Sequence, residues 1–428
     1  MHPNLSFEQA PPISVPFRFF LTAPVFGVAA GLLLLIKGGD LLQSRWLLET
    51  LAATHLLVAG FMLQAMCGAL MQFVPVAAGG NIWRPRWIAG VVHPLLIVST
   101  GLLVAAFLSQ RAGLFVAAAH GFSVGLGIFL AVIGVALWRS PARGPTIVTL
   151  RMATIGLLVT LILGVLLARA LAQGNSNSLL AWVDVHAAWG LWGWGLMLVS
   201  GVAYFVVPMF QLTPAYPGWM TRSFPPLMVT ALMLWSVQLF SPNEMAKTLG
   251  LVGGLMSAGI FAGVTLQLQM QRRRKVSDTT LRYFRLAMLC LAAAVLLGAG
   301  VLWHPEVADD PRAIVGLGVL TLVGVFVSAI AGMLYKIVPF LNWLHLQQAS
   351  GLHSMPPTMN QMMAESQLRW QFYAHLLALG VLLLAVWIPA LGRIAGVLFA
   401  VDCAWLGVNL LNAMRAYRRF RRRIPAVA

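Results

Sequence analysis

Histidine is the residue type that gives this sequence its clearest capacity for chemistry. Nine histidines occur in 428 residues, and five of them lie inside long apolar stretches: His55, His93, His120, His186 and His375. An ionisable side chain in an apolar span costs free energy and usually serves a function. Imidazole is an axial ligand of haem iron and also suits copper. We therefore expect a histidine-ligated metal or haem within these stretches.

The depth of each histidine sorts the candidates into two groups. His55, His120 and His186 lie in the outer third of their expected helices, about 8 to 12 Å deep at about 1.5 Å per residue, and at least two of them are expected to bind haem or metal. His93 and His375 each follow an Arg-Trp pair in the inner third and are weaker candidates. The alternatives are interhelical packing for the outer group and exposure to water at the interface for the inner group.

Two acidic residues could assist such a site. Asp402 lies at mid-depth in the last apolar stretch, with no other charge near it in the sequence. It is either hydrogen-bonded across helices or part of a proton path. Asp184 is close to His186 and could orient that ring as a hydrogen-bond acceptor, the alternative being a solvated interfacial carboxylate.

A segment near the C-terminal end combines histidine with methionine. The expected inner loop, residues 343–367, contains His345, His353, Met355, Met359, Met362 and Met363. Thioether and imidazole ligands together favour Cu(I). The alternative is an apolar loop that lies on the membrane, so copper remains a second cofactor choice after haem.

Composition excludes a soluble protein. The chain is 60% hydrophobic and 9% charged, and its mean hydropathy is +0.86, whereas about a quarter of the residues in a soluble domain are charged. Its three cysteines all lie in apolar runs, and no nucleotide-binding, zinc-protease or hydrolase motif is present. The net charge of +17 comes from basic residues beside apolar spans, which indicates topology and not nucleic-acid binding.

Twelve apolar runs have the length of a transmembrane helix. They are residues 19–37, 50–76, 87–109, 112–138, 147–172, 181–210, 221–241, 246–270, 279–303, 313–343, 368–389 and 390–415. An even number places both termini on one side, which then carries 21 of the 28 Lys and Arg residues. By the positive-inside rule this side is cytoplasmic, so we expect a bacterial-type inner-membrane protein that keeps its first helix and contacts lipid.

The apolar runs repeat in groups of four. A Gly and a Pro seven residues later recur as Gly68 and Pro75, Gly201 and Pro208, and Gly332 and Pro339. Arg18, Arg151 and Arg285 recur at similar intervals. The sequence predicts one transmembrane domain, 1–428, of three four-helix units at about 15–140, 145–275 and 279–415, in which the second helix of each unit forms the inner wall. Each Val-Pro pair should end or kink its helix.

This topology resembles the catalytic subunit of haem-copper oxidases and nitric oxide reductases, and within that superfamily the NnrS-type membrane haem proteins. Those proteins open with an FRPFF-like run, which is similar to residues 16–20, and their second helix carries a histidine before a Gly-Phe step, like His55 before Gly60 and Phe61. The second helix also leaves the membrane through Val-Pro, Gly79-Gly80-Asn81 and Pro85. The resemblance implies a histidine-ligated, b-type haem and a cytochrome or quinol as electron donor.

The chain also departs from that superfamily. Its seventh expected helix, 221–241, has no histidine pair, and its tenth, 313–343, has no histidine. Only His55 and His186 match ligand-bearing helices of the oxidases, and His304-Pro305-Glu306-Val307 lies in an outer loop. A conventional oxygen-reducing centre is therefore not expected, and any haem should lie between the second and sixth helices.

Three functions remain open on the sequence. The leading one is a haem-binding membrane protein for electron transfer or for nitric oxide or oxygen-linked redox handling. The second is a copper or haem transporter or chaperone, and the third is a partner subunit without a cofactor. Whether the protein is an enzyme, which histidines pair, and whether it forms an oligomer stay undecided.

Overall fold

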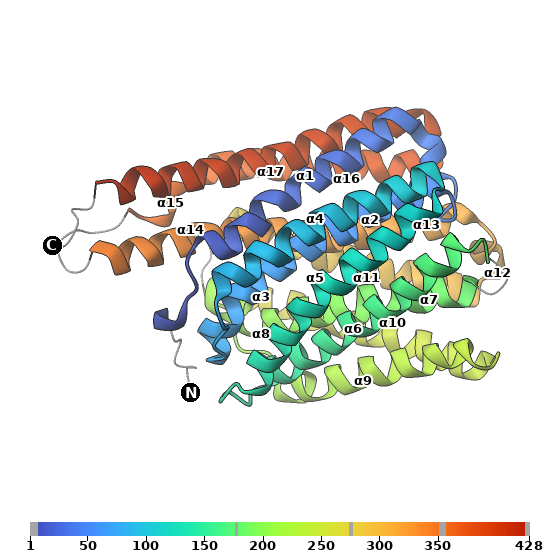
Figure 1. Ribbon diagram of the computed structural model, residues 1–428, viewed down its shortest axis with the longest axis horizontal. Helices are drawn as coiled ribbons and strands as arrows, with labels where there is room; N and C mark the ends of the chain where they lie inside the picture. Colours follow the sequence, from blue (N-terminus) through green and yellow to red (C-terminus); the bar gives the residue numbers. More distant parts are fainter. Residues whose placement is uncertain (1–6, 176–178, 274–276, 351–356, 424–428) are drawn as a thin grey trace.

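The computed structural model describes residues 7–175, 179–273, 277–350 and 357–423 as a bundle of long helices (Figure 1). These described residues contain no β-strand. In lipid, each backbone N–H and C=O has to find a partner within the protein, and a helix provides those partners inside one segment. The apolar stretches therefore fold as helices.

The helices follow one another through the chain with short connections. The first third forms α1 (Ser14–Lys37), α2 (Leu48–His55), α3 (Leu63–Ala78), α4 (Pro85–Ser109) and α5 (Ala112–Trp138). The middle third forms α6 (Pro145–Ala172), α7 (Leu179–Ala188), α8 (Met197–Gln211), α9 (Gly218–Ser236) and α10 (Glu244–Met270). The last third forms α11 (Thr279–Trp303), α12 (Pro305–Ala308), α13 (Pro311–Val319), α14 (Ser328–Ser350), α15 (Met359–Met362), α16 (Glu365–Trp387) and α17 (Gly392–Arg421).

Shorter helical segments complete the described chain. Three are π-helical and join α2 to α3, α7 to α8 and α13 to α14: η3 (Leu56–Met62), η4 (Trp189–Leu196) and η6 (Leu320–Val327). Four are 3-10 turns: η1 (Phe7–Gln9), η2 (Gly38–Leu42), η5 (Val237–Leu239) and η7 (Pro389–Leu391).

The chain is an all-helical, multi-pass integral membrane protein. Eleven helices in the described residues are long and apolar enough to cross a membrane. The expected span at 221–241 is not among them; it forms α9, which has 19 residues and contains Pro225 and Pro226. Helix α9 runs along the bundle beside α10, and the start of α1 and the end of α17 lie at the same end (Figure 1).

The helices pack as a closed ring around three inner spans. Helix α1 packs along α17, so the first and last long helices of the chain are neighbours (Figure 1). The inner spans are 48–78, 180–211 and 311–350, which are the expected second, sixth and tenth helices. Of their most apolar stretches, 78%, 61% and 67% respectively are buried, against 50% or less in the other eight spans. Sites enclosed by protein therefore lie along these three spans.

The inner spans meet at equivalent positions of their π-helical segments. The segments start 133 and then 131 residues apart, the intervals that also separate Gly68, Gly201 and Gly332. A Cβ atom added to Gly195 would lie 2.6 Å from Met62 Cε and 2.7 Å from Phe326 Cζ. A glycine is needed there because the side chains from the two other inner spans already fill the space.

The inner spans do not end at their prolines. Pro75, Pro208 and Pro339 all lie inside helices, which continue to Ala78, Gln211 and Ser350 respectively. Of the two effects expected of a Val-Pro pair, ending or kinking its helix, the first does not occur at these positions. The expected inner loop at 343–367 is also shorter, because residues 343–350 belong to α14 and α15 forms within the remainder.

Candidate functional site

Two of the outer histidines face each other across the first and second inner spans. His55 is the last residue of α2, and His186 lies on α7, three residues before η4. Their ring centroids are 6.5 Å apart and their planes differ by 18°. The π-helical turns that follow widen the backbone directly after each histidine, and such bulges occur frequently at functional sites.

Backbone carbonyl groups orient both imidazole rings. His55 Nδ1 lies 2.7 Å from Leu51 O, one turn earlier in α2, and His186 Nδ1 lies 3.1 Å from Thr160 O on α6. A carbonyl oxygen only accepts hydrogen bonds, so each Nδ1 carries a proton and each neutral ring keeps its lone pair on Nε2. Within the described chain, neither Nε2 atom has a hydrogen-bond partner. This is the tautomer of a metal-ligating histidine whose other nitrogen donates to a carbonyl.

The separation of the rings matches a shared metal ion. With metal-nitrogen bonds of about 2.0–2.1 Å and a ring centre about 1.1 Å from its nitrogen, two imidazoles on opposite sides of one ion have centres roughly 6.3 Å apart. The described residues contain no group of three or more His, Cys, Asp and Glu side chains that could hold a metal. A cofactor at this place would therefore take two protein ligands, as a haem with two axial histidines does.

Apolar and small residues surround the pair. The Phe107 ring of α4 lies 5.1 Å from His55, centre to centre. On the other side, a Cβ atom added to Gly164 of α6 would lie 3.0 Å from His186 Cε1. The absence of a side chain at Gly164 thus leaves room for the His186 ring.

An ion pair joins the two segments that carry these histidines. Arg45 Nη1, just before α2, lies 2.7 Å from Asp184 Oδ1 on α7. Asp184 therefore does not orient His186, as the sequence had suggested, because its carboxylate binds Arg45 and the ring binds the Thr160 carbonyl. The pair instead holds the start of α7 against the chain that precedes α2.

His120 and His93 lie apart from this pair. His120 is exposed on α5, and its Nδ1 hydrogen-bonds to Val116 O at 2.9 Å within the same helix. His93 on α4 is half-buried, and its Nε2 hydrogen-bonds to Thr22 Oγ1 on α1 at 2.8 Å. Depth in the membrane therefore grouped three histidines, of which the structure brings only His55 and His186 together.

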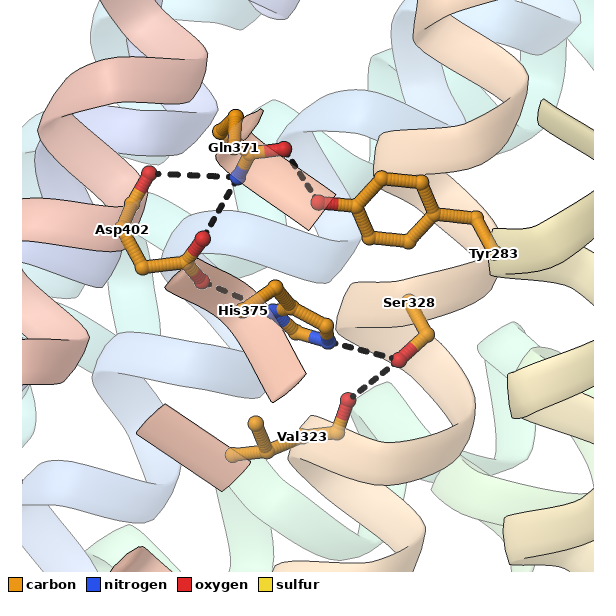
Figure 2. A network of polar contacts seen from close by, with 6 residues as sticks. All are labelled: Tyr283, Val323, Ser328, Gln371, His375 and Asp402. Carbon is orange, nitrogen blue, oxygen red and sulfur yellow. Dashed lines mark hydrogen bonds and ion pairs between the residues drawn. The ribbon is translucent and has the colours of Figure 1, made fainter. Parts of the chain in front are cut away.

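His375 and Asp402 form a second site in the last third of the chain (Figure 2). His375 Nδ1 on α16 lies 2.7 Å from Asp402 Oδ2 on α17, and His375 Nε2 lies 2.8 Å from Ser328 Oγ on α14. His375 is completely buried. The alternative of a water-exposed interfacial histidine is therefore wrong for His375.

The neighbours of this second site were missed in the sequence. Gln371 Nε2 donates to Asp402 Oδ1 at 2.5 Å, and the Tyr283 hydroxyl donates to Gln371 Oε1 (Figure 2). Gln371 precedes His375 by four residues, and this spacing puts two side chains on one helix face. That spacing could have revealed Gln371, whereas Tyr283 and Ser328 come from other helices and carry no such signal.

The methionine and histidine segment is spread over several elements. His345 lies on α14, Met359 and Met362 on α15, and Met363 directly after it. His353 and Met355 lie outside the described residues.

A scan of the sequence against protein-family models finds no match, and a search of curated proteins finds none either. The geometry of the two histidine sites is therefore the basis for assigning a function.

Proposed function

We propose that the chain is a haem-binding membrane protein of the haem-copper oxidase type, in which His55 and His186 would hold one haem. The observation that carries this proposal is the pair of nearly parallel imidazoles at 6.5 Å, each with Nδ1 on a backbone carbonyl and Nε2 without a partner in the described chain. Each ring thus keeps an unprotonated Nε2, and the distance between the ring centres is close to that of two imidazoles that share one metal ion.

The pair of histidines favours one of the redox roles considered above. His55 and His186 would both hold the haem, which would supply one-electron redox chemistry when bound. With two protein ligands, such a group would have no free position for nitric oxide or oxygen. Electron transfer therefore fits the His55–His186 pair better than gas chemistry, and a cytochrome or quinol remains the expected electron donor.

The unit structure and the orientation belong to the same proposal. Three four-helix units are supported by the spacing of the π-helical segments and by the contact of Met62, Gly195 and Phe326. The bacterial-type inner membrane, with both termini in the cytoplasm, is supported by the 21 basic residues expected on the side of the termini.

An optical spectrum of the purified full-length protein, oxidised and reduced, tests the proposal. We expect haem absorption that is lost in His55→Ala and in His186→Ala but retained in His120→Ala, which removes an exposed histidine at similar depth. Size-exclusion chromatography of each variant separates loss of haem from loss of fold. A wild-type protein that is folded, colourless and free of haem would overturn the proposal, and metal analysis would then show whether copper occupies the pair.

A further inference from the structure

The His375–Asp402 couple is an ionisable pair near the middle of the bundle. The exposed fractions of the two side chains are 0% and 2%. His375 lies ten residues after the start of α16, and Asp402 lies ten residues after the start of α17, so each is about 15 Å from that end of its helix at about 1.5 Å per residue. Ionisable groups in such a position are costly and are typical of proton relays.

The hydrogen bonds around Ser328 allow two positions for its hydroxyl proton. The hydroxyl can donate to Val323 O at 3.2 Å or to His375 Nε2 at 2.8 Å. In the first arrangement, which the charge balance below favours, Ser328 Oγ accepts a hydrogen bond from a protonated His375 Nε2 (Figure 2).

One further proton then lies between His375 Nδ1 and Asp402 Oδ2. If it is on Nδ1, the couple is an imidazolium beside a carboxylate; if it is on Oδ2, both groups are neutral. The net charge of the couple is zero in both arrangements. A zero net charge suits the low dielectric constant of the interior, where an uncompensated ion is expensive.

The surroundings contain no other charge that would neutralise an ionised Asp402. In the described part of the chain, no Lys or Arg forms an ion pair with it. The titratable groups that interact electrostatically with it are Tyr283 on α11, Tyr335 on α14 and Cys403 on α17. Gln371 donates to its other oxygen. The shared proton is therefore the main source of charge balance.

A cavity at one end of the bundle reaches Tyr335, a neighbour of this network. The cavity has a volume of about 300 Å³ and is lined by Asp278, Lys336 and Glu365, and also by Tyr335. The Tyr335 hydroxyl accepts a hydrogen bond from Asn409 Nδ2 at 2.9 Å. Tyr335 thus stands between the cavity and Asp402, and its ring centre is 6.1 Å from that of Tyr283.

We infer that His375 and Asp402 form a proton-binding site that holds one shared proton and exchanges it with water through the cavity at Tyr335. This site stands on its own geometry and does not depend on the haem proposed at His55 and His186.

Release of the proton moves a third side chain. The couple becomes an ionised Asp402 with a neutral His375 protonated on Nδ1, and His375 Nε2 then needs a donor. The Ser328 hydroxyl supplies it by turning away from Val323 O, which keeps its bond from the Ser328 backbone N–H at the end of η6. The charge state of the couple is thereby linked to the π-helical segment that contacts the other inner spans.

Nitrogen NMR of histidine-labelled, full-length protein in lipid nanodiscs tests the inference. Ser328→Ala identifies the His375 signal, because it changes only the ring that contacts Ser328. We expect Nε2 to be protonated at neutral pH, to exchange in D2O, and to lose its proton as the pH is raised. Asp402→Asn should abolish this transition, whereas Glu244→Gln, at an exposed carboxylate, should leave it unchanged.

Two results would overturn the inference. One is a His375 ring that at neutral pH carries its proton on Nδ1 alone. The other is an Nε2 proton that neither exchanges in D2O nor titrates over the pH range in which the protein stays folded. Both are measured on the wild-type chain, so the test holds even if Asp402→Asn fails to fold.

Discussion

The two histidine sites differ in what binds the second nitrogen of each ring. At the outer pair, His55 and His186 use Nδ1 for backbone carbonyls and leave Nε2 without a partner in the described chain. At the inner couple, His375 binds side chains with both nitrogens, and one of these is the carboxylate of Asp402. The first arrangement fits the proposed ligation of a haem, and the second fits the proposed shared proton. The neighbours of each ring are thus the basis for assigning different chemistries to the same residue type.

Removing one histidine from each site is the strongest test of this comparison. His55→Ala should remove the haem absorption completely, because one of the two proposed haem ligands is lost, and should change the unfolding of the haem-free protein little. His375→Ala should keep the haem absorption and lower the thermal unfolding midpoint. Absorption spectra of both variants in one detergent measure the bound haem, and thermal unfolding in the same detergent measures the stability. If His375→Ala were folded but as free of haem as His55→Ala, the two sites would not have the separate roles proposed for them.

The two aspartates give the next largest difference. Asp402→Ala leaves His375 buried without its partner, and breaking a buried pair in this way costs about 3–5 kcal/mol. Asp184→Ala removes an ion pair whose side chains are 28% and 40% exposed, and exposed pairs contribute about 0.2–1 kcal/mol. Denaturation of both variants in the same detergent measures the contrast. Equal losses of stability would mean that the environment of Asp402 is far more polar than the structure indicates.

A small change beside His186 should affect the outer site alone. Gly164→Ala places a methyl group 3.0 Å from His186 Cε1, so the ring has to shift by a few tenths of an ångström. We expect a shifted or weakened haem spectrum and a stability change below about 1.5 kcal/mol. Gly101→Ala is the matched control, because nothing lies within 4 Å of its added Cβ atom. An unchanged spectrum in Gly164→Ala would show that the position of His186 does not control the cofactor.

Much of the fold could be predicted from the sequence, but less of the two histidine sites could. Apolar runs of spanning length located eleven membrane helices, because in lipid such a run has no alternative to a helix. They also predicted a span at 221–241, where α9 is not among the eleven, and they ended the tenth span at 343, whereas α14 continues to Ser350. His120 shows the limit for the sites, since it has the depth of His55 and His186 but is exposed on α5.

The sequence by itself determined that the chain crosses a membrane many times, which residues are ionisable within it, and roughly how deep they lie. Hydropathy and the rise of a helix suffice for these properties. Only the tertiary structure decided that His55 faces His186 and that His375 meets both Asp402 and Ser328. The rotation of each helix about its axis depends on packing against its neighbours, and in this bundle it depends on close contacts such as those of Gly164 and Gly195. A partner on another helix leaves no spacing in the sequence that could identify it.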